Sequence, residues 1–268
     1  MDGFTNLLYK YLLKSNFFIS FCAVLFFHAG TLLLNTNPLI EPELISALIF
    51  INTYLIYSVS QKQMLVSPLV FSSKNIFLIV IAITSIVLSL LILSFREILF
   101  LGHLGIISIF YNASSSNSRI IPFRALPLVK IFLIAYVWAS VGSVFPFLLA
   151  ENENSGNVWI LFISQFLFIL SITLPFDIRD YYRDRVNKLL TIPGLIGITN
   201  TKKLALILLW LSIFSFVFSF GSLIGNIVLG IISSFLIYFS SEKRKNYYYL
   251  LLVDGAIVVY YFMVKISA

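Results

Sequence analysis

Charged side chains are scarce in this chain of 268 residues. Asp, Glu, Lys and Arg together make up 11% of it, against about 25% in a typical soluble protein, whereas apolar residues make up 60%. So few charges do not cover a water-exposed surface, which excludes a soluble enzyme and a disordered chain. Cys22 is the one cysteine, so an intrachain disulfide and a thiolate metal cluster are excluded as well. We therefore expect a multi-pass integral membrane protein.

Apolar stretches account for most of the chain, and nine of them have about the length that a helix needs to cross a hydrocarbon core of about 30 Å. The first is longer than a signal-peptide core, and no small-residue cleavage site follows it. We expect an all-α bundle of about nine transmembrane helices that forms a single domain over residues 1–268. The nine stretches are about 16–34, 44–60, 76–95, 98–111, 126–149, 158–175, 204–220, 224–238 and 249–264.

The basic residues alternate with these spans. If the N-terminus lies inside, sixteen of the eighteen Lys and Arg residues fall in inner segments, and only Arg96 and Lys265 fall outside. The positive-inside rule therefore predicts an inner N-terminus and an outer C-terminus. The net charge of +7 then reflects topology, so we expect the bilayer as a partner and no nucleic acid. The longest inner segment, 177–203, is predicted to be a loop.

The start of this segment carries three aspartates, Asp177, Asp180 and Asp184. Their spacing of i, i+3 and i+7 puts them within about 60° of arc on one helix face. Carboxylates so close together repel one another unless a cation lies between them, and magnesium takes oxygen ligands and bridges carboxylates to substrate phosphates. The pattern is therefore typical of a magnesium site for an anionic, phosphate-bearing substrate. The alternative is a solvated helix end held by internal ion pairs, such as Asp180 with Arg183.

These residues resemble the second aspartate motif of the UbiA-type membrane prenyltransferases, in particular the menaquinone-pathway branch. The pieces that carry the resemblance are Asp177-Ile-Arg-Asp180, Asp184-Arg185, Thr191-Ile-Pro193 and Gly197. Nine spans with an inner N-terminus are similar to that family's layout as well. The resemblance implies that magnesium grips the diphosphate of a polyprenyl donor, that loss of diphosphate leaves an allylic cation, and that an acceptor attacks this cation.

The resemblance assigns roles residue by residue. Asp180 and Asp184 fall on the paired catalytic, magnesium-ligating aspartates, and Asp177 falls on a metal-ligating position one turn earlier. A weaker similarity, to a Tyr/Pro/Lys/Arg stretch of the family, covers Arg124 and Lys130. The residues expected to bind the substrate are Asn52, Arg124, Lys130, Arg179, Arg185 and Lys188.

Two features depart from the family. Its first motif, Asn-x-x-x-Asp-x-x-x-Asp, keeps Asn52, but its two aspartate positions are Ile56 and Ser60 here. Lys188 stands where the family usually has a glycine. Half of the expected magnesium site is therefore missing, and whether the chain is an enzyme stays open at this point.

Three hypotheses follow: a divergent prenyltransferase using an isoprenoid diphosphate, a non-catalytic protein of the same fold that binds a lipid or a partner, and a carrier of a small anion or a lipid. Asp254, inside the ninth span, is expected either to face a cavity or to form a hydrogen bond between helices. The compact layout is typical of a bacterial inner-membrane protein. The sequence names no acceptor, prenyl chain length or oligomeric state.

Overall fold

The computed structural model describes residues 16–36, 40–62, 73–112, 129–150, 157–187, 189–221 and 223–267. Within these ranges the chain is helical, as predicted, and consists of nine helical segments, two of which contain a π-helical stretch. In order they are α2 (Phe17–Leu34), α3 (Pro42–Lys62), α4 (Ser73–Ile92), α5 (Phe95–Asn112), α6 (Val129–Ala139) with η3 (Ser140–Val144) and α7 (Phe145–Leu148), α8 (Val158–Val186), α9 (Ile192–Phe220), α10 (Leu223–Tyr238), and η5 (Tyr248–Val253) with α11 (Asp254–Ser267).

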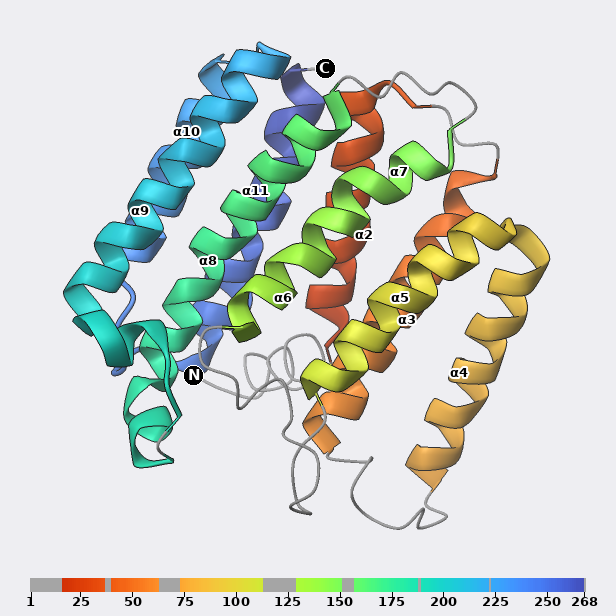
Figure 1. The fold of residues 1–268 in the computed structure, drawn as a ribbon, viewed down its shortest axis with the longest axis horizontal. Helices are drawn as coiled ribbons and strands as arrows, with labels where there is room; N and C mark the ends of the chain where they lie inside the picture. The colour runs from red at the N-terminus through yellow and green to blue at the C-terminus, as the bar shows by residue number, and fades with distance from the viewer. Residues whose placement is uncertain are drawn as a thin grey trace, which may run out of the picture.

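The segments run alternately up and down between two ends of the bundle (Figure 1). The first described helix, α2, begins at one end, and α11 finishes at the opposite end (Figure 1), as an odd number of spans requires. Five segments are long and apolar enough to cross a membrane: α2, α6 to α7, α8, α9, and η5 to α11. Shorter apolar helices cover Pro42–Ser58, Ile76–Ile92 and Leu223–Tyr238. Which end faces the inside stays a prediction.

The outer surface of the bundle is apolar. Large side chains such as Leu91 and Phe218 are 75% and 85% exposed, which in water would expose a continuous apolar surface. In a bilayer these side chains contact lipid, and the helices satisfy their own backbone groups. The environment of the bundle is therefore a membrane.

The interior depends on close helix approaches. Gly30 of α2 faces Gly142 of η3, and a Cβ atom on Gly30 would overlap the carbonyl oxygen of Gly142. The α8–α9 pair is joined by a hydrogen bond from the Ser212 hydroxyl to the Ser164 carbonyl (2.7 Å) and another from the Ser164 hydroxyl to the Ser212 carbonyl (3.1 Å). Small residues and hydroxyls of this kind are the usual means of helix association in membranes.

The predicted loop at 177–203 is wrong. α8 continues to Val186 and α9 already begins at Ile192, so most of this segment belongs to two helix ends. Within α9, Gly197 has φ 79° and ψ 159° and interrupts the helical backbone. Glycine suits this conformation because it has no Cβ atom. The prediction failed because the polar residues in this segment lowered the hydropathy, although they did not end the helices.

The extra length of α8 determines the depth of the aspartates. At about 1.5 Å per residue, Asp177 lies about 29 Å along the axis from Val158, close to the thickness of the hydrocarbon core. Asp177 therefore lies about one hydrocarbon thickness from the start of α8, and the protein itself buries it together with Asp180 and Asp184.

Candidate functional site

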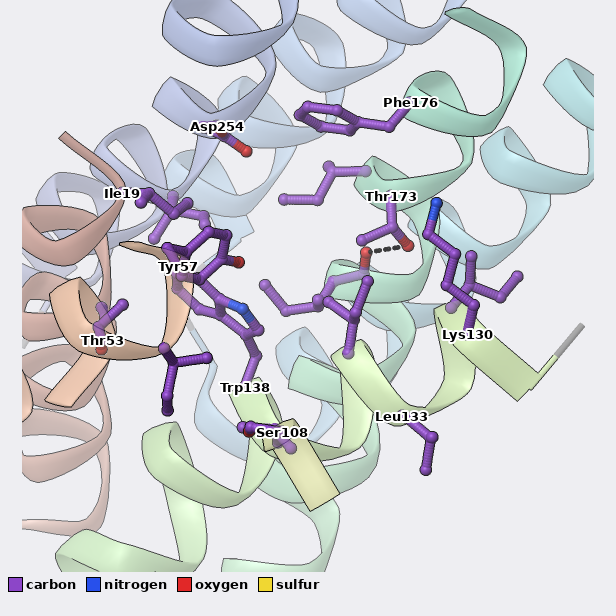
Figure 2. Close-up of a pocket in the computed structure, with 18 of the residues that line it drawn as sticks. Ile19, Thr53, Tyr57, Ser108, Lys130, Leu133, Trp138, Thr173, Phe176 and Asp254 are labelled. Carbon is purple, nitrogen blue, oxygen red and sulfur yellow. Dashed lines mark hydrogen bonds between the residues drawn. The ribbon is translucent and has the colours of Figure 1, made fainter. Parts of the chain in front are cut away.

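A cavity of about 370 Å³ opens between the helices at the end of the bundle where α8 finishes. This volume lies in the range of small-molecule sites, about 300–1,000 Å³. Residues from α2, α3, α5, α6, η3, α8, η5 and α11 line it. Helices that are distant in sequence therefore meet around one space (Figure 2).

The walls of this cavity are mainly apolar and aromatic. Trp138 of α6, Tyr57 of α3 and Phe176 of α8 surround the space (Figure 2), together with aliphatic side chains such as Ile19 and Ile134. Aromatic faces attract cations, and aliphatic walls accept a hydrocarbon chain. The cavity is suited to a ligand with a long apolar part.

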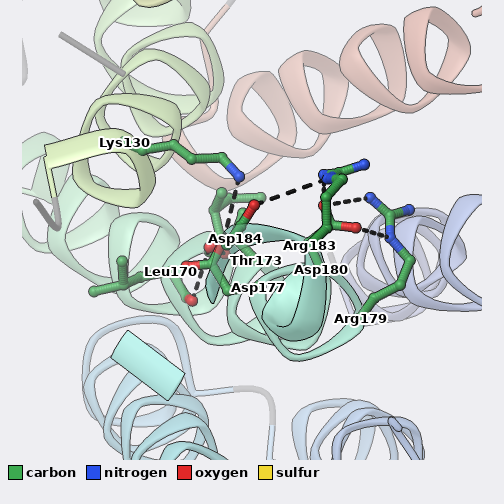
Figure 3. Close-up of polar contacts among 9 residues, drawn as sticks. Lys130, Leu170, Thr173, Asp177, Arg179, Asp180, Arg183 and Asp184 are labelled. Carbon is green, nitrogen blue, oxygen red and sulfur yellow. Dashed lines mark hydrogen bonds and ion pairs between the residues drawn. The ribbon is translucent and has the colours of Figure 1, made fainter. Parts of the chain in front are cut away.

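One end of the cavity carries charge. Asp177, Asp180 and Asp184 lie on consecutive turns of α8 and are only 3%, 8% and 6% exposed. The ammonium of Lys130, from the first turn of α6, is 3.2 Å from Asp177 Oδ1 (Figure 3). Its positive charge acts on all three carboxylates.

Arg179 is held in place on two sides. Its Nε and Nη2 atoms donate to the two carboxylate oxygens of Asp180 at 2.9 and 3.0 Å (Figure 3). Its guanidinium also lies over the rings of Phe176 and Tyr249, 5.2 and 5.4 Å from their centroids. A planar guanidinium with a bidentate partner and aromatic contacts is a well-oriented cation.

Arg183 is the most exposed of these cations. Its Nη2 atom lies 2.7 Å from Asp180 Oδ2, and its Nε atom lies 3.8 Å from Asp184 Oδ1. Its side chain is 59% exposed and lines the cavity. We call Lys130, Arg179, Arg183 and the three aspartates the charged cluster.

The sequence-predicted site residues fall into three groups. Asp177, Asp180, Lys130 and Arg179 line the cavity together, and Asp184 joins the charged cluster through Arg183. Among described residues, Asn52 and Arg185 do not line the cavity. Arg124 and Lys188 lie outside the described residues.

The positions of Asn52 and Arg185 have clear causes. The Asn52 side-chain oxygen accepts a hydrogen bond from the Ser85 hydroxyl at 2.8 Å, which joins α3 to α4. Arg185 is exposed in the last turn of α8, because it is one residue past Asp184 and so points about 100° away from it. Their roles in substrate binding stay predictions.

The predicted magnesium site contains carboxylates, which are suitable ligands for magnesium. Their arrangement differs from that of a metal site. No group of three His, Cys, Asp or Glu side chains in the described ranges could hold a metal ion. Lys130 is already paired with Asp177, and both oxygens of Asp180 accept from arginines. On the facing α3, the first lost aspartate position, Ile56, is an apolar part of the cavity wall. The described residues do not fit a bound magnesium in this arrangement.

Several cavity residues were not selected as site residues from the sequence. Tyr57 and Trp138 carry no local signal that separates them from the many other aromatics of the chain. Arg183 belongs to the recognised charged segment but was not among the residues expected to bind the substrate. Asp254, at the junction of η5 and α11, was singled out as a buried carboxylate, and the structure turns it toward the cavity (Figure 2).

The π-helical stretch η5 explains the direction of Asp254. A π turn inserts one extra residue into a helix and rotates the residues that follow. Among the described residues, no hydrogen bond or ion pair is made by the Asp254 carboxylate, which is half-buried. Of the two expectations for Asp254, the cavity-facing one is therefore confirmed.

This bundle, with its cavity at one end, has the fold of the UbiA-type membrane prenyltransferases, as predicted. The solved structure of a digeranylgeranylglyceryl phosphate synthase is similar to it with a TM-score of 0.58 and 15% sequence identity, over 100% of this chain and 97% of that chain. No protein-family description and no curated protein sequence matches the chain.

Proposed function

We propose that this chain binds an isoprenoid diphosphate in the cavity and transfers its prenyl group to an acceptor at the membrane surface. The observation that carries the proposal is the cavity itself, which has oriented cations at one end and apolar, aromatic walls along the rest. The structural neighbour is a synthase of a geranylgeranylated glyceryl phosphate in membranes, which supports the same general chemistry.

The charged end would receive the diphosphate. Lys130 and Arg183 line the cavity and carry N–H donors, while Asp180 keeps Arg179 and Arg183 in fixed orientations. Charge-assisted hydrogen bonds from such groups favour the leaving diphosphate over the intact ester, because negative charge develops there as the bond breaks.

The walls would hold the prenyl chain. When the bond between C1 and the diphosphate oxygen breaks, the carbon becomes part of an allylic cation, which Trp138, Tyr57 or Phe176 can stabilise with an aromatic face. An acceptor nucleophile then forms the new bond to C1 and releases a proton, which the Asp254 carboxylate on the cavity wall accepts. The bilayer gives the lipid substrate access to the cavity.

Magnesium was predicted from the aspartate spacing and is implied by the resemblance to the UbiA-type prenyltransferases. Because Asp177, Asp180 and Asp184 are already paired with basic side chains, no step of this proposal is assigned to a metal. A bacterial inner-membrane location also stays a proposal.

The test is binding and cleavage of geranylgeranyl diphosphate by the purified chain in lipid nanodiscs. We expect saturable binding that Arg183→Gln weakens about tenfold and that Lys203→Gln leaves unchanged. Lys203 is a matched control, since it is an exposed cation on α9 that does not line the cavity. Release of inorganic diphosphate in the presence of membrane lipids would support the transferase.

Two results would contradict the proposal in different ways. If the diphosphate lipid does not bind, both transfer and lipid-diphosphate binding fail. If it binds and is never cleaved in any membrane extract tested, the chain is a non-catalytic binding protein with this fold.

A further inference from the structure

We propose that the anion site of this cavity works without a divalent cation, and that the Lys130 ammonium occupies the cation position for which the aspartate spacing predicts magnesium. The ligand class is the diphosphate of an isoprenoid lipid, so the inference rests on the proposed function.

The first observation is the position of Lys130. It comes from α6, 47 residues before Asp177, and reaches across to α8 at the point where the three carboxylates lie (Figure 3). It is 3.2 Å from Asp177 Oδ1 and acts electrostatically on Asp180 and Asp184 as well. A single positive charge that contacts Asp177 and acts on its two neighbouring carboxylates is in the place of a metal ion.

The second observation is that Asp180 and Asp184 also have basic partners in the protein. Arg179 takes both oxygens of Asp180, and Arg183 bridges Asp180 and Asp184. The charged cluster thus holds three cations and three anions, and its net charge is zero. Adding a divalent ion would place two further positive charges beside three existing ones.

The third observation concerns the opposite wall. A bridging magnesium needs oxygen ligands around it, and α3 presents Ile56 to the cavity at the position that resembles a family aspartate. The absence of acidic ligands at this position of α3 is consistent with the presence of cations on α6 and α8, because those cations supply the positive charge that a metal ion would otherwise bring. The charged cluster is arranged to meet an anion directly.

Arg183 shows how such an anion could be bound. A guanidinium has five N–H donors, and the carboxylate contacts of Arg183 involve only Nη2 and Nε. The side chain is 59% exposed and lines the cavity. Arg183 can therefore donate to a diphosphate oxygen while Asp180 still fixes its orientation.

The test compares farnesyl diphosphate binding by the full-length wild type and Lys130→Gln in nanodiscs, each in EDTA and in millimolar magnesium. We expect the wild type to bind with affinities that agree within about threefold in the two conditions. Lys130→Gln should bind at least tenfold more weakly in EDTA, and magnesium should restore part of that loss, because the vacated carboxylates then accept the ion.

Thermal unfolding without the lipid gives a readout that does not depend on binding. Magnesium should raise the Tm of Lys130→Gln and leave that of the wild type and of Lys203→Gln unchanged. A Tm of Lys130→Gln that does not respond to magnesium would overturn the inference, even if the variant is less stable.

The outcomes separate the inference from the function on which it rests. Wild-type binding that requires magnesium would overturn the inference and leave the proposed function standing. Absence of wild-type binding in both conditions would overturn both. Equal binding in EDTA and magnesium by the wild type, with magnesium dependence only in Lys130→Gln, supports the inference.

Discussion

Replacing Lys130 by Met should destabilise the bundle by leaving Asp177 as a buried negative charge without its partner. The two charged groups are 3.2 Å apart, which corresponds to an attraction of about 5 kcal/mol at an effective dielectric constant of about 20. Dehydration of both groups offsets part of this value. The Asp177 side chain is 4% exposed, and that of Lys130 is 23% exposed. The carboxylate is therefore the group that loses more of its hydration.

The expected loss follows from these values. Removing one partner of a buried ion pair destabilises a protein by about 3–5 kcal/mol, and the partial exposure of Lys130 places the expectation near the lower end, about 3 kcal/mol. Replacing both residues, as Lys130→Met with Asp177→Asn, should destabilise by only about 1 kcal/mol, because no uncompensated charge remains.

The assay is the free energy of unfolding in mixed micelles, measured by SDS titration for the wild type, both single variants and the double variant. The four values form a cycle that isolates the interaction between the two residues. A loss below about 1 kcal/mol in Lys130→Met, or a double variant as unstable as the sum of the single variants, would refute the reasoning.

Three further predictions follow from the structure. Gly30→Ala should lower the free energy of unfolding by about 1–3 kcal/mol, because its methyl group meets the Gly142 carbonyl; Gly102→Ala, with open space around it, is the matched control and should not destabilise. Ile134→Trp should fill the cavity and abolish geranylgeranyl diphosphate binding without a loss of Tm larger than a few degrees; unchanged binding would mean that the ligand lies elsewhere. Asp254→Asn should keep that binding and reduce diphosphate release on the order of 100-fold, and an unchanged rate would exclude a role in the reaction.

Helix count and order were predictable because they depend on local composition. Each of the nine apolar stretches overlaps one helical segment. The third and fourth are joined by a tight turn between Ile92 and Phe95, where the Glu97 carboxylate accepts from the Ser94 backbone N–H at 2.7 Å. Apolar length is a direct consequence of bilayer thickness. Helix ends were predicted less well, because a helix can continue into polar residues beyond its apolar stretch, as α8 does.

The sequence by itself determined that three aspartates share a face and lie near the end of a span, because helical periodicity fixes the face. The i,i+3 spacing also indicated the pair of Asp180 with Arg183 on the same helix, but only the tertiary structure decided what neutralises Asp177. The partner of Asp177 comes from α6, and one of the two rings that lie against Arg179 comes from η5, so both depend on which helices pack together. The charge balance of the site therefore depends on helix packing as well as on pairs within α8, and local periodicity encodes only the second part.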